Sequence, residues 1–235
     1  MAYFRIDCFS SVLDMATDVI VTAPDGIDLE KAPVVLLLHG LSDNASGWSR
    51  YTRCEQYGRE KGVIFVMPEV QRSFYMDMDE GLDYLTYITE ELPQWIRKTF
   101  RFEGEWYVMG LSMGGYGAMK CGLLRRDLFR GIAAFSSVAD IRAWFSGHDD
   151  GERMAIRKKL RDEDDLYYLF REYGKNSRLF LSCGTEDRLY RYNRELSYYL
   201  DTLPVLKETW FDNGTHSWRF WDESLSRALD YYFGK

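Results

Sequence analysis

The 235-residue sequence has no long apolar run and no basic leader at its start. No stretch approaches the roughly 18 consecutive apolar residues that a membrane-spanning helix needs, which argues against a membrane partner. A secretory signal would place basic residues before an apolar run, and this pattern is absent from Met1–Asp7. We therefore expect a cytoplasmic protein.

Positive charge is also scarce. Lys and Arg number 30 against 37 Asp and Glu, which leaves a formal net charge of −7 at pH 7. Proteins that bind nucleic acid or anionic lipid neutralise phosphates with a basic surface, and this composition supplies none. We expect no nucleic-acid partner, and a small molecule, neutral or cationic, is the more natural ligand.

Cysteine is rare and scattered. No two of the four cysteines, Cys8, Cys54, Cys121 and Cys183, form a C-x-x-C pair, and three lie in or beside apolar runs. Spacing of this kind is typical of reduced, buried thiols rather than of a disulfide framework or a zinc site. We predict no metal site.

Apolar residues make up 46% of the chain and aromatic residues 16%, enough to bury one large core. The sequence predicts a single domain over 1–235.

Short extended runs occur at Tyr3–Cys8, Thr17–Val21, Val34–His39, Val63–Met67, Trp106–Met109, Ile132–Phe135, Leu179–Cys183 and Lys207–Phe211. Helical patterns between them include Trp48–Arg59, a stretch from Leu82 that Pro93 should kink or restart, and stretches beginning at Leu189 and Trp218.

This alternation predicts an α/β protein with a mostly parallel sheet, helices on both faces and an antiparallel pair at the amino terminus. One segment, Asp140–Arg178, is longer than a simple connection requires and is interpreted as a small inserted lid. It contains two helical patterns, Arg153–Leu160 and Asp165–Tyr173. Trp144 is a candidate for the wall of an acyl or aryl pocket, with Phe145, Leu166, Leu169 and Phe170 as weaker candidates.

The most informative motif is Gly110-Leu111-Ser112-Met113-Gly114-Gly115, which follows an apolar strand and precedes a small-residue helix. Gly-x-Ser-x-Gly in that context is typical of a nucleophile elbow, where a sharp turn places the serine at the strand tip. Gly110 and Gly114 are then glycines because a Cβ would collide with the neighbouring strand and helix. The competing interpretation is a glycine-rich turn in an unrelated sheet protein.

A serine nucleophile needs a base, and an acid to orient that base. Only His39, His148 and His216 are available, and His216 lies carboxy-terminal to Ser112 after the last expected strand. His148 is the alternative base, and His39 is expected to be structural. Asp187 ends the preceding strand, 29 residues before His216. The order serine, acid, histidine is that of α/β-hydrolases; Glu186 and Asp212 remain alternatives for the acid.

The transition state of acyl transfer also needs backbone N–H donors for its oxyanion. Met113, directly after the serine, is one predicted donor, and Leu41 after Val34–Gly40 is the other. An ordinary turn at His39–Leu41 is the competing interpretation.

The chain resembles the esterase D family, and within it the bacterial tributyrin esterases. The resemblance rests on Leu36–Leu41, Asp43-Asn44, Gly110–Ala118, Cys183–Asp187 and Gly214–Trp218, in this order. It implies an α/β-hydrolase fold, no cofactor, an inserted lid, and carboxylesterase activity with Ser112, Asp187 and His216 as the triad. It also implies Leu41 and Met113 as oxyanion-hole donors.

We therefore predict a serine carboxylesterase that hydrolyses short-chain acyl or small aryl esters through an acyl-enzyme. A feruloyl or acetyl-xylan-type esterase is the first alternative. An S-formylglutathione hydrolase is the second, although such enzymes commonly carry Leu-Thr-Cys-Thr where this chain has Leu41-Ser42-Asp43-Asn44. A non-catalytic binding protein on the same fold is the remaining class. The sequence leaves open a homo-oligomer.

Overall fold

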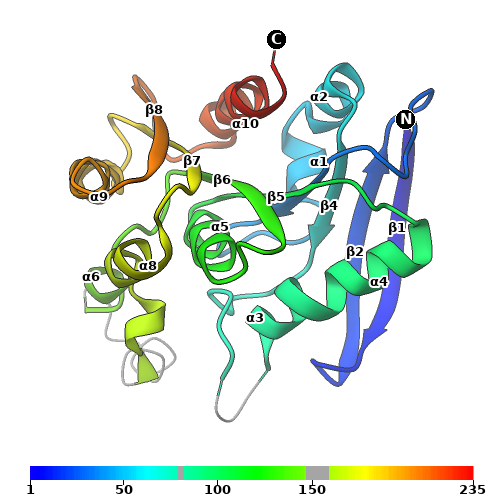
Figure 1. The fold of residues 1–235 in the computed structure, drawn as a ribbon, viewed down its shortest axis with the longest axis horizontal. Helices are drawn as coiled ribbons and strands as arrows, with labels where there is room; N and C mark the ends of the chain where they lie inside the picture. The colour runs from blue at the N-terminus through cyan, green and yellow to red at the C-terminus, as the bar shows by residue number, and fades with distance from the viewer. Residues whose placement is uncertain (79–81, 147–158, 235) are drawn as a thin grey trace.

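The computed structural model describes residues 1–78, 82–146 and 159–234. Within them one sheet has the strand order β1-β2-β4-β3-β5-β6-β7-β8 (Figure 1). The pairs β1–β2 and β2–β4 are antiparallel, and the other pairs are parallel. The strands are β1 (Ala2–Ser10), β2 (Met15–Ala23), β3 (Val34–Leu38), β4 (Ile64–Pro68), β5 (Trp106–Leu111), β6 (Phe129–Phe135), β7 (Arg178–Gly184) and β8 (Leu206–Asp212).

All eight expected strands are present, and the predicted mostly parallel α/β sheet is confirmed. The central strands β3, β4 and β5 are buried at every position, as expected for strands covered on both faces. The outermost strands β1 and β8 instead mix exposed and half-buried positions. Leu41 and Ser112 follow the carboxyl ends of the central strands β3 and β5, and Asp187 and His216 follow those of β7 and β8.

Helices cover both faces of this sheet (Figure 1). One face carries α1 (Gly47–Tyr51), α2 (Cys54–Lys61) and α10 (Trp218–Phe233). The other carries α3 (Tyr84–Thr86), a π-helical turn (Tyr87–Glu91), α4 (Leu92–Phe100), α5 (Met113–Leu124), α6 (Ile141–Ser146), a 3₁₀ turn (Asp162–Asp164), α8 (Leu166–Tyr173) and α9 (Tyr190–Leu200). No helix in these described ranges is long and apolar enough to span a bilayer.

The continuous helix predicted over Trp48–Arg59 is wrong. The chain forms two helices there, because Thr52 is extended, with φ −129° and ψ 172°. The Thr52 hydroxyl donates to the carbonyl of Trp48 and accepts from the N–H of Cys54, which thus has a side-chain acceptor in place of a helical one. The Arg53 N–H donates to the carboxylate of Asp222 in α10. A local side chain and a distant one therefore stabilise the break.

The helix that the sequence predicts Pro93 to kink or restart is irregular just before this residue, but its backbone stays helical from Thr86 through Leu92. The π-helical turn ends at Glu91, and Pro93 lies in the first turn of α4. Proline has no N–H, so the carbonyl four residues earlier, that of Thr89, loses its helical partner. The guanidinium of Arg125 donates to this carbonyl at 2.9 Å.

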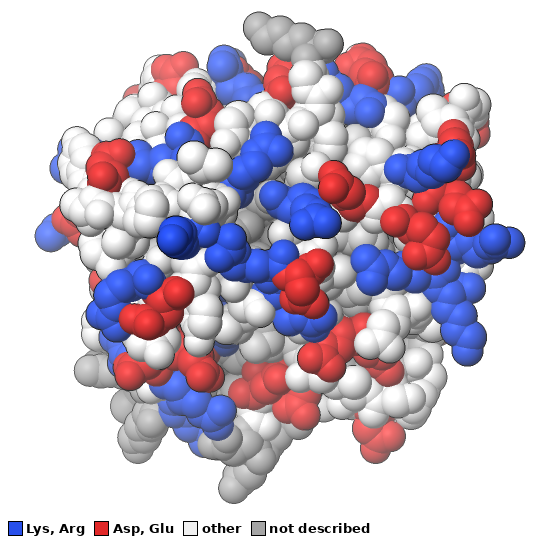
Figure 2. Space-filling model, viewed as in Figure 1, with Lys and Arg blue, Asp and Glu red and all other residues white. Residues whose placement is uncertain are grey.

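The charged side chains are mixed in sign. Over the face in Figure 2, Lys and Arg side chains are interspersed with Asp and Glu. Exposed pairs such as Arg227–Glu223 and Arg191–Glu195 connect neighbouring helical turns. Pairs of this kind contribute little to stability. Each glutamate neutralises the positive charge of the neighbouring arginine.

Candidate active site

Ser112 lies at the turn between β5 and α5 in a strained conformation, with φ 53° and ψ −115°. Non-glycine residues with positive φ cost on the order of 1–3 kcal/mol, so the surroundings must hold them in place. The Ser112 N–H donates to the carbonyl of Phe135 at 2.8 Å, and its carbonyl accepts from the N–H of Val138 at 3.2 Å. Phe135 is the last residue of β6 and Val138 lies three residues beyond it, so the end of this strand fixes the turn from one side.

Two glycines make the turn sterically feasible. A Cβ on Gly114 would lie 2.3 Å from the carbonyl oxygen of Leu38, and one on Gly110 would lie 2.2 Å from the carbonyl oxygen of Gly114. The first clash is with the end of β3 and the second with α5. The backbone of the elbow thus packs directly on its neighbouring strand and helix, with no room for a side chain.

The structure brings together Ser112, His216 and Asp187. The Nε2 atom of His216 lies 3.1 Å from the Ser112 hydroxyl oxygen. Its Nδ1 atom lies 2.8 Å from a carboxylate oxygen of Asp187. An ionised Asp187 can only accept, so Nδ1 carries the proton and the Nε2 lone pair faces the serine hydroxyl. This is the geometry in which an imidazole can take the serine proton.

Asp187 is 5% exposed and comes from the loop after β7. Burial by itself would raise the pKa of this carboxyl. The hydrogen bond and charge of His216, with the N–H of Leu189 at 2.8 Å, instead hold the pKa of Asp187 below its ordinary value of 3.8. The side chain is therefore an anion at neutral pH, facing the imidazole.

The alternative acids and bases are placed differently. Glu186 is exposed, and so is Asp212, whose carboxylate accepts from the N–H of Asn213. His148 lies outside the described residues. His39 is buried between the carbonyl of Gly40 and the N–H of Val70, which occupy both of its ring nitrogens. Among the described residues, Glu186, Asp212 and His39 make no hydrogen bond to Ser112 or His216.

The loop after β3 runs beside Ser112, because a Cβ on Gly40 would lie 3.6 Å from that of the serine. Three side chains fix its carbonyl groups. Trp48 donates to Leu38 at 3.1 Å, Tyr75 to His39 at 2.9 Å and His39 to Gly40 at 2.8 Å. In the described part of the chain the N–H of Leu41 makes no hydrogen bond. Met113 is the first residue of α5, so its N–H has no helical acceptor either.

A second carboxylate, that of Asp43, lies in the same loop. One of its oxygens approaches to 3.0 Å of where a Gly40 Cβ would be, and its N–H donates to the Gly40 carbonyl at 3.2 Å. Burial raises the pKa of Asp43, against the opposing charges of His39 and His216 and a backbone hydrogen bond from Gly40. The backbone of Asp43 therefore closes a turn of this loop on Gly40.

Trp144 lies half-buried in α6. Its ring is 6.5 Å from that of Phe74, and the guanidinium of Arg188 lies 5.7 Å above it. Arg188 directly follows Asp187, so this contact joins α6 to the acid loop. The other four pocket candidates, Phe145, Leu166, Leu169 and Phe170, are at most 1% exposed and belong to the core.

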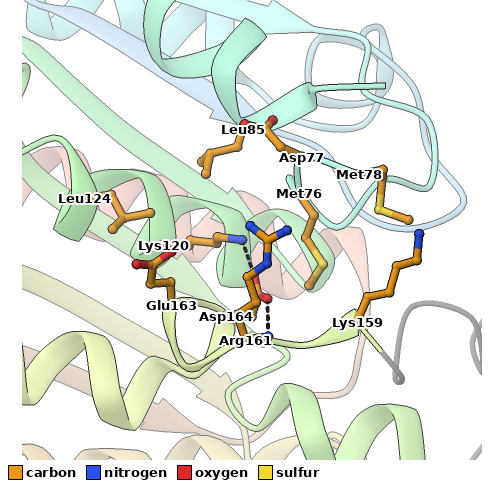
Figure 3. Close-up of a pocket in the computed structure, with 10 residues that line it drawn as sticks. All are labelled: Met76, Asp77, Met78, Leu85, Lys120, Leu124, Lys159, Arg161, Glu163 and Asp164. Carbon is orange, nitrogen blue, oxygen red and sulfur yellow. Dashed lines mark hydrogen bonds and ion pairs between the residues drawn. The ribbon is translucent and has the colours of Figure 1, made fainter. Parts of the chain in front are cut away.

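The segment Asp140–Arg178 is anchored to α5. Lys120, 3% exposed, pairs with the carboxylate of Asp164 at 2.5 Å, and the Tyr116 hydroxyl donates to the Asp164 carbonyl at 2.8 Å. Figure 3 shows the pair beside a cavity of about 160 Å³, with Arg161 reaching into it from the same turn. This cavity does not include the triad.

Of the two helices predicted in this segment, the one at Asp165–Tyr173 is confirmed as α8. Most of the other, Arg153–Leu160, lies outside the described residues.

Sequence reasoning missed two residues that support the site. Asn193 is fully buried in α9, where its amide accepts from the N–H of Ser137 and donates to the Ser137 carbonyl, next to the Ser112 turn. It shares a helix face with Leu196 and Leu200, so a polar residue in that apolar stripe was the available signal. Trp221 in α10 packs against the His216 ring, and nothing in its spacing distinguishes it from a core aromatic.

The fold and this arrangement define a serine hydrolase of the α/β-hydrolase class. The chain belongs to the esterase family described as "Putative esterase", whose family model matches residues 10–232. It is therefore an esterase, and the predicted likeness to esterase D-type enzymes is confirmed.

Three relatives are distant in sequence but align over almost the whole chain. An acetyl esterase of Caldicellulosiruptor saccharolyticus is 27% identical over 98% of both sequences. Two Staphylococcus aureus structures superpose with a TM-score of 0.88. The fluorophosphonate-binding serine hydrolase F, with substrate bound, is 27% identical and aligns over 98% of this chain and 97% of its own. The S-formylglutathione hydrolase is 26% identical over 98% of both.

Proposed function

We propose that Ser112 is the nucleophile of a two-step carboxylesterase reaction. His216 takes the serine proton as the hydroxyl oxygen attacks the ester carbonyl, and returns it to the departing alcohol. The acyl-enzyme is then hydrolysed by a water that His216 deprotonates, which regenerates Ser112 and releases the acid. Asp187 holds the imidazole in the required tautomer and stabilises its charged form. The continuous hydrogen-bond chain from Ser112 through His216 to Asp187 is the observation that carries this proposal.

The N–H groups of Leu41 and Met113 are the proposed donors to the oxyanion. Their support is that side chains hold the carbonyls of Leu38, His39 and Gly40, while neither N–H has an acceptor among the described residues. A preorganised donor pair of this kind contributes on the order of 3–4 kcal/mol per donor to transition-state stabilisation.

Short-chain acyl and small aryl esters are the proposed substrates, with no cofactor. The full-length likeness to an acetyl esterase supports a small acyl group. Trp144 is the proposed wall of the substrate pocket, because it lies half-buried in α6 and contacts Arg188 next to the acid. An aromatic wall also suits a feruloyl ester, and relatives named S-formylglutathione hydrolase suggest a thioester.

Two experiments test the proposal. The intact protein is incubated with a fluorophosphonate and its mass is measured by mass spectrometry beside Ser112→Ala, with Ser49→Ala, at a half-buried serine of α1, as the control. We expect one adduct on the wild type and the control, and none on Ser112→Ala; an adduct on Ser112→Ala would refute the assignment.

A second experiment tests the substrate class by comparing the kcat/KM values for p-nitrophenyl butyrate, methyl ferulate and S-formylglutathione. We expect the butyrate to be best, and a higher value for either rival would replace the substrate class.

A further inference from the structure

The outer edge of β1 is an unusual feature for a sheet of this size. β1 spans nine residues, contains no proline, and has a neighbouring strand, β2, on one side only (Figure 1). It also carries exposed aromatic side chains: Phe9 is 66% exposed and Tyr3 45%. Long, regular edge strands present unpaired N–H and C=O groups that can pair with another chain, and proteins normally protect them.

The pairing of β2 determines which β1 residues offer these groups. The Asp18 carbonyl accepts from the N–H of Glu69 on the β4 side of β2, so even-numbered residues of β2 face β4 and odd-numbered ones face β1. In the β1–β2 ladder the residue numbers of opposite residues sum to 25, as for Phe4 and Val21. Each even-numbered residue of β1 thus lies opposite an odd-numbered residue of β2. Even-numbered residues of β1 therefore bond to β2. The outward N–H and C=O groups belong to Tyr3, Arg5, Asp7 and Phe9.

We propose that two copies of this chain pair through β1 about a two-fold axis at Ile6, which joins their sheets antiparallel. In this register, partners have numbers that sum to 12: Arg5 lies opposite Asp7 of the second copy, and Tyr3 opposite Phe9. All four outward-facing residues find outward-facing partners, which gives about eight backbone hydrogen bonds at two per pair. The aromatic pairs cover the exposed rings of Tyr3 and Phe9.

Charge distinguishes this register from its neighbours. A shift by two residues in one direction places Arg5 opposite Arg5, and a shift in the other places Asp7 opposite Asp7. Like charges directly opposite one another destabilise a sheet. A shift by one residue is excluded, because outward-facing groups would then meet residues whose groups already bond to β2.

The isolated chain also has an electrostatic defect that this dimer removes. Asp7 lies directly opposite Asp18 in the β1–β2 ladder, so two carboxylates face each other. Arg5 reaches Asp18 at 3.6 Å, while Asp7 has no ion pair within the described ranges. In the dimer, Arg5 of the second copy lies beside Asp7. Both carboxylates then have a guanidinium nearby.

A charge swap tests the register. Sedimentation velocity over a concentration series would measure the dimer dissociation constant for the wild type, Arg5→Asp, Asp7→Arg and the double variant. Each single change places like charges opposite one another twice, so we expect the dissociation constant to rise by roughly ten-fold or more. The double variant again pairs Asp with Arg and should return to within a few-fold of the wild type. Glu208→Arg on β8 makes the same charge change as Asp7→Arg at the other edge and should leave the dimer intact.

Amide hydrogen exchange provides a second measurement. The N–H groups of Arg5 and Asp7 should exchange slowly in the wild-type dimer and faster in Asp7→Arg, with esterase activity reporting that each variant is folded. A wild type that stays monomeric at every concentration would overturn the proposal. So would a dimer that withstands both single changes, or one that only Glu208→Arg dissociates.

Discussion

The imidazole of His216 stands edge-on to the indole of Trp221, with ring centroids 4.8 Å apart and an interplanar angle of 88°. Trp221 is 5% exposed and is itself held by the ring of Trp218 at 5.3 Å. The histidine therefore has three neighbours that set its orientation: Ser112, Asp187 and this indole. The two hydrogen bonds fix the ring nitrogens, and the indole packs on the ring and limits its tilt.

Replacing Trp221 with alanine should impair catalysis as well as stability. We expect kcat to fall by about ten- to hundred-fold, because small misplacements of a catalytic group are costly. Loss of the buried ring should lower the free energy of unfolding by roughly 3–5 kcal/mol. Trp221→Phe keeps an aromatic partner and should retain most of kcat. Steady-state kinetics and urea unfolding separate the two effects, and equal kcat values for both variants would contradict the orienting role.

A methyl group at Gly114 should disrupt the elbow. The added Cβ would lie 2.3 Å from the Leu38 carbonyl oxygen, so β3 or α5 must shift. We expect Gly114→Ala to lose most activity and to unfold at lower urea concentration. Gly26→Ala is the control, since that glycine has φ +78° but open space around it and should cost only about 1 kcal/mol. Comparable losses in both variants would show that the clash at Gly114 adds nothing, and would contradict the prediction.

The buried pair Lys120–Asp164 should stabilise the contact between α5 and the segment that follows α6. Breaking a buried ion pair typically costs about 3–5 kcal/mol, because the remaining charge loses its ionic partner; among the described residues, Asp164 would then keep the N–H of Arg161 at 2.8 Å. We expect this loss in Lys120→Met, and a substantial recovery in the double variant Lys120→Met with Asp164→Leu. Thermal unfolding of the two singles and the double gives the coupling free energy. Additive losses in the double variant would mean that the pair contributes nothing as a pair.

Much of the fold could be predicted because its strands are short apolar runs between clear turn residues. The central strands are uniformly apolar, and the elbow motif and the loop at His39–Leu41 follow two of them directly. Chain order then selects Asp187 and His216 from a short set of candidates, and the structure places both within hydrogen-bond distance of their neighbours.

The remainder depends on contacts between residues distant in sequence. The break at Thr52 needs Asp222 as a partner, and the carbonyl that Pro93 leaves without a partner is satisfied by Arg125. Neither pairing leaves a trace in local periodicity. The core positions of Leu166 and Phe170 were likewise ambiguous, because an apolar helix face is compatible with either a pocket or a core.

The electrostatics of Asp187 predict how stability responds to acid. The hydrogen bonds it accepts hold its pKa in the folded protein below the ordinary value of 3.8. A carboxyl with a lowered folded pKa contributes its full stabilisation above the unfolded value, and loses it as the pH falls through the folded value. Asp187→Asn removes this titration while keeping the shape of the side chain.

The free energy of unfolding of the wild type should therefore fall faster on acidification than that of Asp187→Asn, in the window from about pH 5 downward. At pH 7 the same variant should lose roughly 10⁴-fold in kcat, because an amide at this position no longer enforces the productive tautomer of His216. Urea unfolding at half-unit pH steps, compared with Asp212→Asn at the exposed carboxylate, isolates the buried group. Parallel pH curves for the wild type and Asp187→Asn would show that the Asp187 carboxyl titrates alike in the folded and unfolded chains, and that its hydrogen bonds do not stabilise its charge.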